Sequence, residues 1–142
     1  MIFPDVNLLL YAQFASYPEH DRARRWWEGL LNADKEVAIA APVLFGFLRL
    51  ATSPRVFTQP MTVDAAVDAA SAWLDMPHVH LATPGPRHLE IAFRLLRELG
   101  TAANLTTDAQ VAALAIEHQG EVHSNDGDFA RFAQLRWVNP LH

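Results

Sequence analysis

The sequence contains no cysteine, and that absence excludes several kinds of chemistry. Disulfide bonds, iron–sulfur clusters, thiolate zinc sites and a cysteine nucleophile all need this side chain. The sequence also lacks the run of about 20 apolar residues that a membrane-spanning helix needs. The first ten residues are apolar, but they carry no basic leader and Asp5 interrupts them, so they do not resemble a secretion signal. We therefore expect a cytoplasmic protein without a membrane segment.

Positive charge is scarce. Eleven lysines and arginines stand against 16 acidic residues, which gives a formal net charge of −5. A protein that holds nucleic acid by uniform surface positivity has the opposite balance. Binding of nucleic acid would therefore require a local basic patch or a metal ion. Glycine-rich phosphate loops and the Gly-x-Ser-x-Gly nucleophile motif are also absent.

The chain has 142 residues, of which 51% are hydrophobic, as expected for a single domain over residues 1–142 with a buried core. Short apolar runs alternate with segments of helical periodicity. The runs predict strands at residues 1–5, 36–40, 79–81, 121–124 and 135–138, and the periodicity predicts helices from about residue 6 and over 20–31, 42–52, 62–76, 86–99 and 107–119. We expect Thr107 and Gln110 to form a capping box. The alternation predicts an α/β sandwich with a mostly parallel sheet, whose chemistry lies beyond the carboxyl ends of the strands.

Aspartates lie at those strand ends. Asp5 ends the first strand, Asp126 and Asp128 follow the strand over 121–124, and Asp108 lies in the first turn of the preceding helix. If the first and fourth strands are neighbours, the carboxylates converge, repel one another and raise some of their pKa values. A hard divalent cation such as Mg²⁺ or Mn²⁺ removes this conflict, and it also activates water for attack on a phosphodiester.

Each aspartate also has a purely structural explanation. Asp5 could cap the helix that follows it, and the helix dipole favours Asp108 without any function. The segment over 125–128 is an ordinary turn sequence, in which Asp128 could be an N-cap. These explanations stay open for single residues. They are weaker together, because all the aspartates would have to meet at one sheet edge by chance.

Motifs in order along the chain carry a resemblance to a known family. The segments are Ile2–Asn7, Phe47–Phe57, Thr107–Ala115 and Ser124–Phe132. In this order and spacing the sequence resembles the PIN-domain family, and within it the VapC-type toxins of bacterial VapBC toxin–antitoxin pairs. The resemblance implies a PIN-like three-layer α/β/α sandwich and a Mg²⁺- or Mn²⁺-dependent endoribonuclease that hydrolyses RNA. It also implies a cognate VapB-type antitoxin and a homodimer.

The resemblance also assigns roles to residues of this sequence. The metal-binding positions match Asp5, Asp108 and Asp126, and Asp128 matches a neighbouring catalytic carboxylate. The polar positions that support the site match Asn7 and Ser124.

Arginines provide candidate phosphate contacts, because a guanidinium group pairs well with phosphate oxygens. The candidates are Arg49, Arg55 and Arg131, for which a role in surface solubility or ion pairing is the alternative. Two adjacent tryptophans, Trp26 and Trp27, cannot face the same direction from one helix, and we expect one of them in an interface.

One position departs from the family pattern. The family has a glutamate three residues before an arginine, and Gly46 stands at that place before Arg49. The neighbours Leu44 and Phe45 are apolar and do not replace the carboxylate. This departure leaves a second function open, a catalytically weakened PIN-like module that only binds RNA or a protein.

A third function class is an aspartyl-phosphate protein, such as a response-regulator receiver or a phosphatase. Receivers and phosphatases also use aspartates at strand ends. They need a lysine late in the chain, whereas Lys35 is the only lysine of this sequence. The phosphatase pattern also needs a second aspartate at the position of Asn7. Both features argue against this class.

Overall fold

The structure is a computed structural model that describes residues 1–142, and it contains one five-stranded sheet. The strands are β1 (Ile2–Pro4), β2 (Val37–Ile39), β3 (Val79–Leu81), β4 (Glu121–His123) and β5 (Arg136–Val138). The helices are α1 (Val6–Gln13), α2 (His20–Leu31), α3 (Ala41–Ala51), α4 (Val63–Leu74), α5 (His88–Leu99) and α6 (Thr106–Glu117), with 3₁₀ turns η1 (Ala103–Leu105) and η2 (Gly127–Arg131). Every strand pair is parallel, in the order β3-β2-β1-β4-β5. The expected α/β fold is confirmed, and the sheet is entirely parallel.

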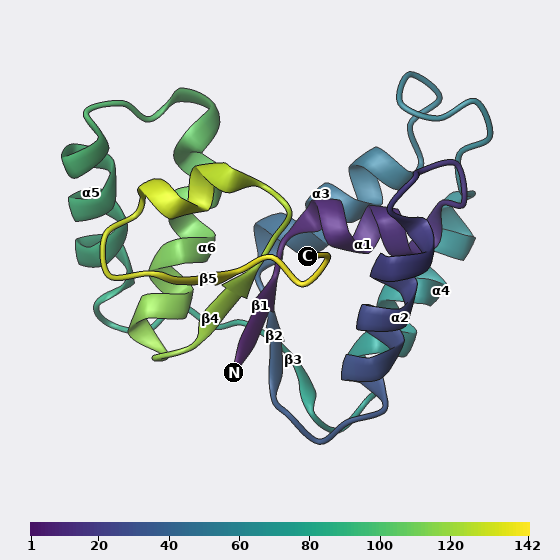
Figure 1. The fold of residues 1–142 in the computed structure, drawn as a ribbon, viewed down its shortest axis with the longest axis horizontal. Coiled ribbons are helices and arrows are strands. Elements are labelled where there is room, and N and C mark those ends of the chain that lie inside the picture. Colours follow the sequence, from purple (N-terminus) through teal and green to yellow (C-terminus); the bar gives the residue numbers. More distant parts are fainter.

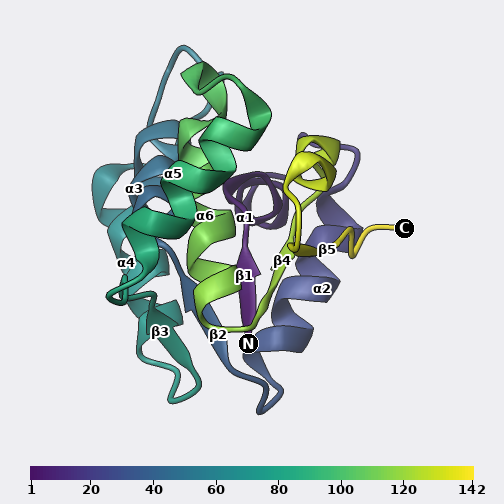
Figure 2. The ribbon, with the colours of Figure 1, turned by 90° about the vertical axis from the view of Figure 1, so that its left-hand side faces the viewer.

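The helices lie on both faces of the sheet (Figures 1 and 2). The chain proceeds from β1 through β2 to β3 in one direction, by way of α1 to α4. It then returns past β1 to β4, by way of α5 and α6. Because such crossovers are right-handed, this reversal puts α5 and α6 on the face opposite α1 to α4. The reversal also makes the gap between the carboxyl ends of β1 and β4 the switch point where ligands bind in such sheets.

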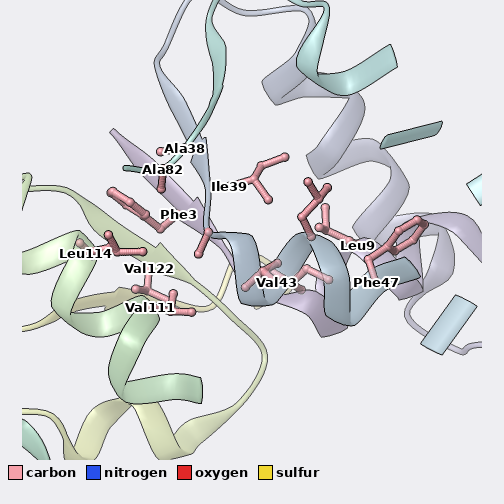
Figure 3. Packing of buried hydrophobic residues seen from close by; sticks show 14 of the residues in the cluster. Phe3, Leu9, Ala38, Ile39, Val43, Phe47, Ala82, Val111, Leu114 and Val122 are labelled. Atoms are coloured by element: carbon pink, nitrogen blue, oxygen red, sulfur yellow. The ribbon is translucent and has the colours of Figure 1, made fainter. Parts of the chain in front are cut away.

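The core lies between the sheet and both helical layers and gathers 34 buried residues into one cluster. Phe3 of β1 and Val122 of β4 are fully buried, and Figure 3 shows Leu114 of α6 beside them. In the other layer, Val43 and Phe47 place α3 against α1. All residues of β1 and β2 are buried, as expected for central parallel strands covered on both faces.

The boundaries of the helices agree with the sequence periodicity, with one error in capping. The capping box of Thr107 and Gln110 is wrong, because α6 begins at Thr106 and its cap residue makes no side-chain hydrogen bond. The turn η1 runs directly into α6, so the Thr106 hydroxyl instead donates to the Ala103 carbonyl oxygen at 2.8 Å. None of the helices combines the length and apolar character needed to cross a bilayer.

Candidate functional site

The pairing of β1 with β4 brings Asp5 opposite Ser124. Pro4 pairs with His123, and the Asp5 backbone N–H donates to the His123 carbonyl oxygen at 2.9 Å. One residue beyond this pair, the Ser124 hydroxyl donates to Oδ2 of Asp5 at 2.7 Å. Asp5 is only 5% exposed and Ser124 is fully buried, so this contact is largely shielded from solvent. The predicted meeting of the two strand ends is therefore observed.

A chain of hydrogen bonds continues from Ser124 into the turn after β4. The Ser124 hydroxyl accepts the backbone N–H of Asp126 at 2.9 Å, and Oδ1 of Asp126 accepts the backbone N–H of Asp128 at 2.9 Å. The N-cap of η2 is thus Asp126, so the alternative explanation of Asp128 as an N-cap is wrong. One serine hydroxyl thereby fixes both the carboxylate of Asp5 and the backbone that carries Asp126.

The structural explanation of Asp5 as a helix cap is also correct. Its Oδ1 accepts the Val6 backbone N–H at 2.8 Å at the start of α1. An ionised carboxylate has about four acceptor positions, so the bonds from Val6 and Ser124 leave capacity for a further ligand. Burial and the charge of Asp126 raise the pKa of Asp5, and the two hydrogen bonds oppose that rise. Capping and ion binding are therefore compatible roles for this side chain.

Asp108 reaches the same electrostatic environment from the opposite helical layer. It is half-buried in the first turn of α6. Burial, together with the negative charges of Asp5, Asp126 and Asp128, raises the pKa of Asp108 to about 7. The direction of this shift is the one expected for like charges that share a site.

Little positive charge compensates these carboxylates. Arg131 lies 4.0 Å from Asp128, and no ion pair involves Asp5, Asp108 or Asp126. A set of oxygen donors with excess negative charge fits a hard divalent cation, which prefers such ligands. No group of three His, Asp or Glu side chains is arranged to hold a metal ion as the structure stands. The metal ligands Asp5, Asp108 and Asp126 thus stay a prediction.

Gly46 lies against Val6 of α1 and has space for a side chain. A Cβ atom at Gly46 would have one neighbour within 4 Å, the Val6 Cγ2 atom at 3.6 Å, which is an ordinary van der Waals contact. Val6 directly follows Asp5, so Gly46 packs against the first turn of the helix that Asp5 caps. Leu44 is buried and Phe45 is 66% exposed, and neither supplies a carboxylate.

The other candidates are spread around the site. Asn7 is half-buried in the first turn of α1, two residues after Asp5, and Arg49 is exposed in the last turn of α3. The contact of Arg131 with Asp128 agrees with the ion-pairing alternative for this arginine. Arg55 is exposed after α3.

Sequence reasoning missed the residues that hold the β4–η2 turn from the side of β5. The Trp137 indole N–H donates to the Ser124 carbonyl oxygen at 3.0 Å, and the Asn139 amide donates to Oδ1 of Asn125 at 2.9 Å. The sequence feature that pointed toward these residues was the predicted final strand at 135–138. Its contacts depend on the pairing of β5 with β4, which the local sequence does not encode.

The PIN domain family matches residues 2–135. The chain belongs to the PIN-domain family. This PIN domain is 52% identical over 141 residues to Ribonuclease VapC33 of Mycobacterium tuberculosis (strain ATCC 25618 / H37Rv), with 99% of each chain covered. It is 40% identical over 136 residues to Ribonuclease VapC37 of the same strain, with 96% of this chain and 94% of the relative covered. The resemblance drawn from the motifs is confirmed.

Solved structures agree with the fold. FitAcB from Neisseria gonorrhoeae superposes with a TM-score of 0.71 at 18% identity, covering 100% of this chain and 99% of the other. Mycobacterium tuberculosis VapC20, described as a Sarcin-Ricin loop cleaving toxin, gives 0.69 at 22% identity, covering 96% and 99%. VapBC2 from Rickettsia felis gives 0.68 at 19% identity, covering 98% of both. At such identities the likeness shows the three-layer fold alone.

Proposed function

We propose that this PIN domain is the VapC ribonuclease toxin of a VapBC toxin–antitoxin system and that it hydrolyses RNA phosphodiester bonds with Mg²⁺ or Mn²⁺. Identity of 52% to a ribonuclease over 99% of both chains supports the activity. One observation in the structure carries the proposal. The Ser124 hydroxyl bonds both the Asp5 carboxylate and the Asp126 backbone at the switch point between β1 and β4. The charges of Asp5 and Asp126 there help to raise the pKa of Asp108.

Each residue of the site has a role in this proposal. Asp5, Asp108 and Asp126 would hold the cation, and Asp128 supports the turn that carries Asp126. When bound, the ion supplies a water of lowered pKa and stabilises charge that develops on the phosphate. Ser124 keeps the Asp5 carboxylate in one orientation through its 2.7 Å hydrogen bond. Asp108 must lose its proton before it can accept a cation, and its pKa of about 7 puts that loss near neutral pH.

Gly46 favours a second candidate function. Without the glutamate, the site has one carboxylate fewer for metal binding, as in a PIN-like module that only binds RNA or protein. Such a module would bind RNA without Mg²⁺ and leave it intact.

The test of the proposal is RNA cleavage by the wild-type protein and by Asp5→Asn, each with Mg²⁺, with Mn²⁺ and with EDTA. Asp68→Asn is the matched control, because Asp68 is an exposed aspartate of α4. We expect the wild type and Asp68→Asn to cleave with metal and Asp5→Asn to fall to background. Retained cleavage by Asp5→Asn, in preparations free of host ribonuclease, would refute the assignment. RNA that the wild type binds but leaves intact with both Mg²⁺ and Mn²⁺ would favour the binding module.

The proposed partners are a cognate VapB-type antitoxin and a second copy of this chain. The relatives carry the VapC name, and the solved neighbours include a toxin–antitoxin complex from Klebsiella pneumoniae with a TM-score of 0.68. Large apolar side chains on α3 and α5 are exposed, as expected for surfaces that meet proteins: Phe45 (66%), Leu89 (61%) and Phe93 (55%). Sedimentation of the protein with and without its antitoxin measures both assemblies.

A further inference from the structure

A groove separates the first half of α2 from the C-terminal segment that follows β5. Its volume is about 430 Å³, and it is lined by Arg22, Arg25, Trp26, Pro140, Leu141 and His142. Figure 2 shows the C-terminal segment beside α2, on the side of the sheet that carries β5. Neither this groove nor the other surface cavity, which Phe14 and Phe57 help to line, includes a carboxylate of the candidate site.

Both walls of the groove are attached to the turn that builds the carboxylate site. On the wall of α2, the Trp26 indole N–H donates to Nδ1 of His123 at 3.0 Å, and His123 directly precedes Ser124. At the start of the other wall, Asn139, which directly precedes the lining residue Pro140, donates to Asn125, and Asn125 directly precedes Asp126. The groove therefore adjoins the residues that hold Asp5 and Asp126.

The two walls are also joined to each other. Nη1 of Arg22 donates to the Leu141 carbonyl oxygen at 3.0 Å, and Leu141 is 6% exposed. Nε2 of His123 lies 2.9 Å from Oε1 of Glu121. The His123 imidazole, which accepts the Trp26 hydrogen bond at Nδ1, is therefore held at both ring nitrogens. The hydrogen bond from Arg22 to Leu141 thus connects the two walls.

The charged side chains that line the groove are arginines. The protein carries a formal charge of −5, yet no Asp or Glu side chain lines the groove. Arg24, the neighbouring arginine of α2, pairs with Glu28 at 3.6 Å, whereas Arg25 is exposed and forms no ion pair. Arg25 and Trp26 line the same groove, and an arginine with an aromatic ring can hold single-stranded nucleic acid through a phosphate contact and stacking on a base.

We propose that the groove between α2 and the C-terminal segment holds the single-stranded RNA substrate next to the carboxylate site, with Arg25 on a phosphate and Trp26 on the adjoining base. This proposal rests on the ribonuclease function. It names the surface that binds the nucleotides next to the phosphodiester bond that is cut. It also explains how an acidic protein binds RNA. Arg25 supplies positive charge locally, and the divalent cation is needed only at the phosphodiester bond that is cut.

The test compares Arg25→Ala with Arg24→Ala, which removes the same charge one residue away. Binding of a fluorescein-labelled single-stranded oligoribonucleotide is measured by anisotropy in EDTA at several salt concentrations, and steady-state cleavage is measured with Mg²⁺. We expect Arg25→Ala to raise Kd and KM about 3- to 10-fold, with kcat within about twofold of the wild-type value. The slope of log affinity against log salt should fall by about 0.7 for the lost phosphate contact. Arg25→Lys, which keeps the charge, should retain most of the slope, and Arg24→Ala should behave as the wild type.

The outcomes separate this proposal from the ribonuclease function. If the wild type cleaves RNA and Arg25→Ala matches Arg24→Ala in Kd, KM and salt slope, the groove does not hold RNA and the proposal is overturned. It is also overturned if Arg25→Ala keeps its RNA affinity but loses binding to a VapB-type antitoxin, because the groove then receives a protein. If the wild type fails to cleave and, among the variants, only Arg25→Ala loses RNA binding, RNA binding in the groove is supported and the ribonuclease function is refuted.

Discussion

Replacing Asp108 with asparagine should stabilise the folded protein at alkaline pH while it removes the nuclease activity. The pKa of Asp108 is raised from 3.8 to about 7 by burial and by the neighbouring carboxylates. Between these two pH values the folded state binds more protons than the unfolded state, so the free energy of unfolding decreases as pH rises. Asparagine keeps the shape of the side chain and cannot acquire the charge, so the variant escapes this decrease.

The magnitude follows from the shift. A rise from 3.8 to about 7 corresponds to roughly 4 kcal/mol at the usual conversion of about 1.4 kcal/mol per pH unit. Asp108 is only half-buried, so solvent and salt screen much of this effect, and we expect about 1–2 kcal/mol above pH 7. In a protein of this size that gain raises the melting temperature by about 3–6 °C. At pH 4 the difference between Asp108→Asn and the wild type should be near zero.

The assay is urea unfolding of the wild type, Asp108→Asn and Asp68→Asn from pH 4 to pH 8.5 in EDTA. A second series adds Mg²⁺, which stabilises a protein by binding only its folded state. We expect Mg²⁺ to raise the stability of the wild type at pH 8 and to raise that of Asp108→Asn much less. A stability difference between Asp108→Asn and the wild type that stays constant across the pH range would refute the reasoning. So would an equal alkaline gain in Asp68→Asn, since Asp68 is exposed on α4.

Other predictions concern residues around the carboxylates. Ser124→Ala removes the 2.7 Å hydrogen bond to Asp5, so the Mg²⁺ concentration for half-maximal cleavage should rise about 10- to 100-fold, and an unchanged titration would exclude a positioning role. Gly46→Glu has room for its Cβ atom and adds a carboxylate beside Val6, so it should lower that Mg²⁺ concentration, whereas Gly46→Gln should not. Gly120→Ala would place a Cβ atom 2.6 Å from the Met1 carbonyl oxygen and 2.7 Å from Phe3, so a loss of about 1–3 kcal/mol is expected in urea unfolding. A Gly120→Ala protein as stable as the wild type would contradict that contact.

Local patterns in the sequence predicted most of the secondary structure. The helix over residues 20–31 begins and ends as its periodicity indicates, and Gly100 ends α5 in the left-handed conformation that suits glycine. The capping box at Thr107 failed because η1 continues into α6, and a continued turn leaves no free N-cap position for that side chain. A capping motif in the sequence works only if the preceding residues leave the helical conformation, and the folded loop decides whether they do.

The sequence alone determined which chemistry is available: it has no thiol, and it carries aspartates at the predicted strand ends with a serine before Asp126. Only the tertiary structure decided that β4 pairs with β1, which puts Ser124 against Asp5 and brings Asp108 within reach of both charges. The groove of Arg25 and Trp26 also depends on the position of β4, because His123 and Asn125 form hydrogen bonds with Trp26 and Asn139 beside it. The physical reason is that parallel strands are joined by long crossovers, so the partner of each strand follows from packing across the whole core.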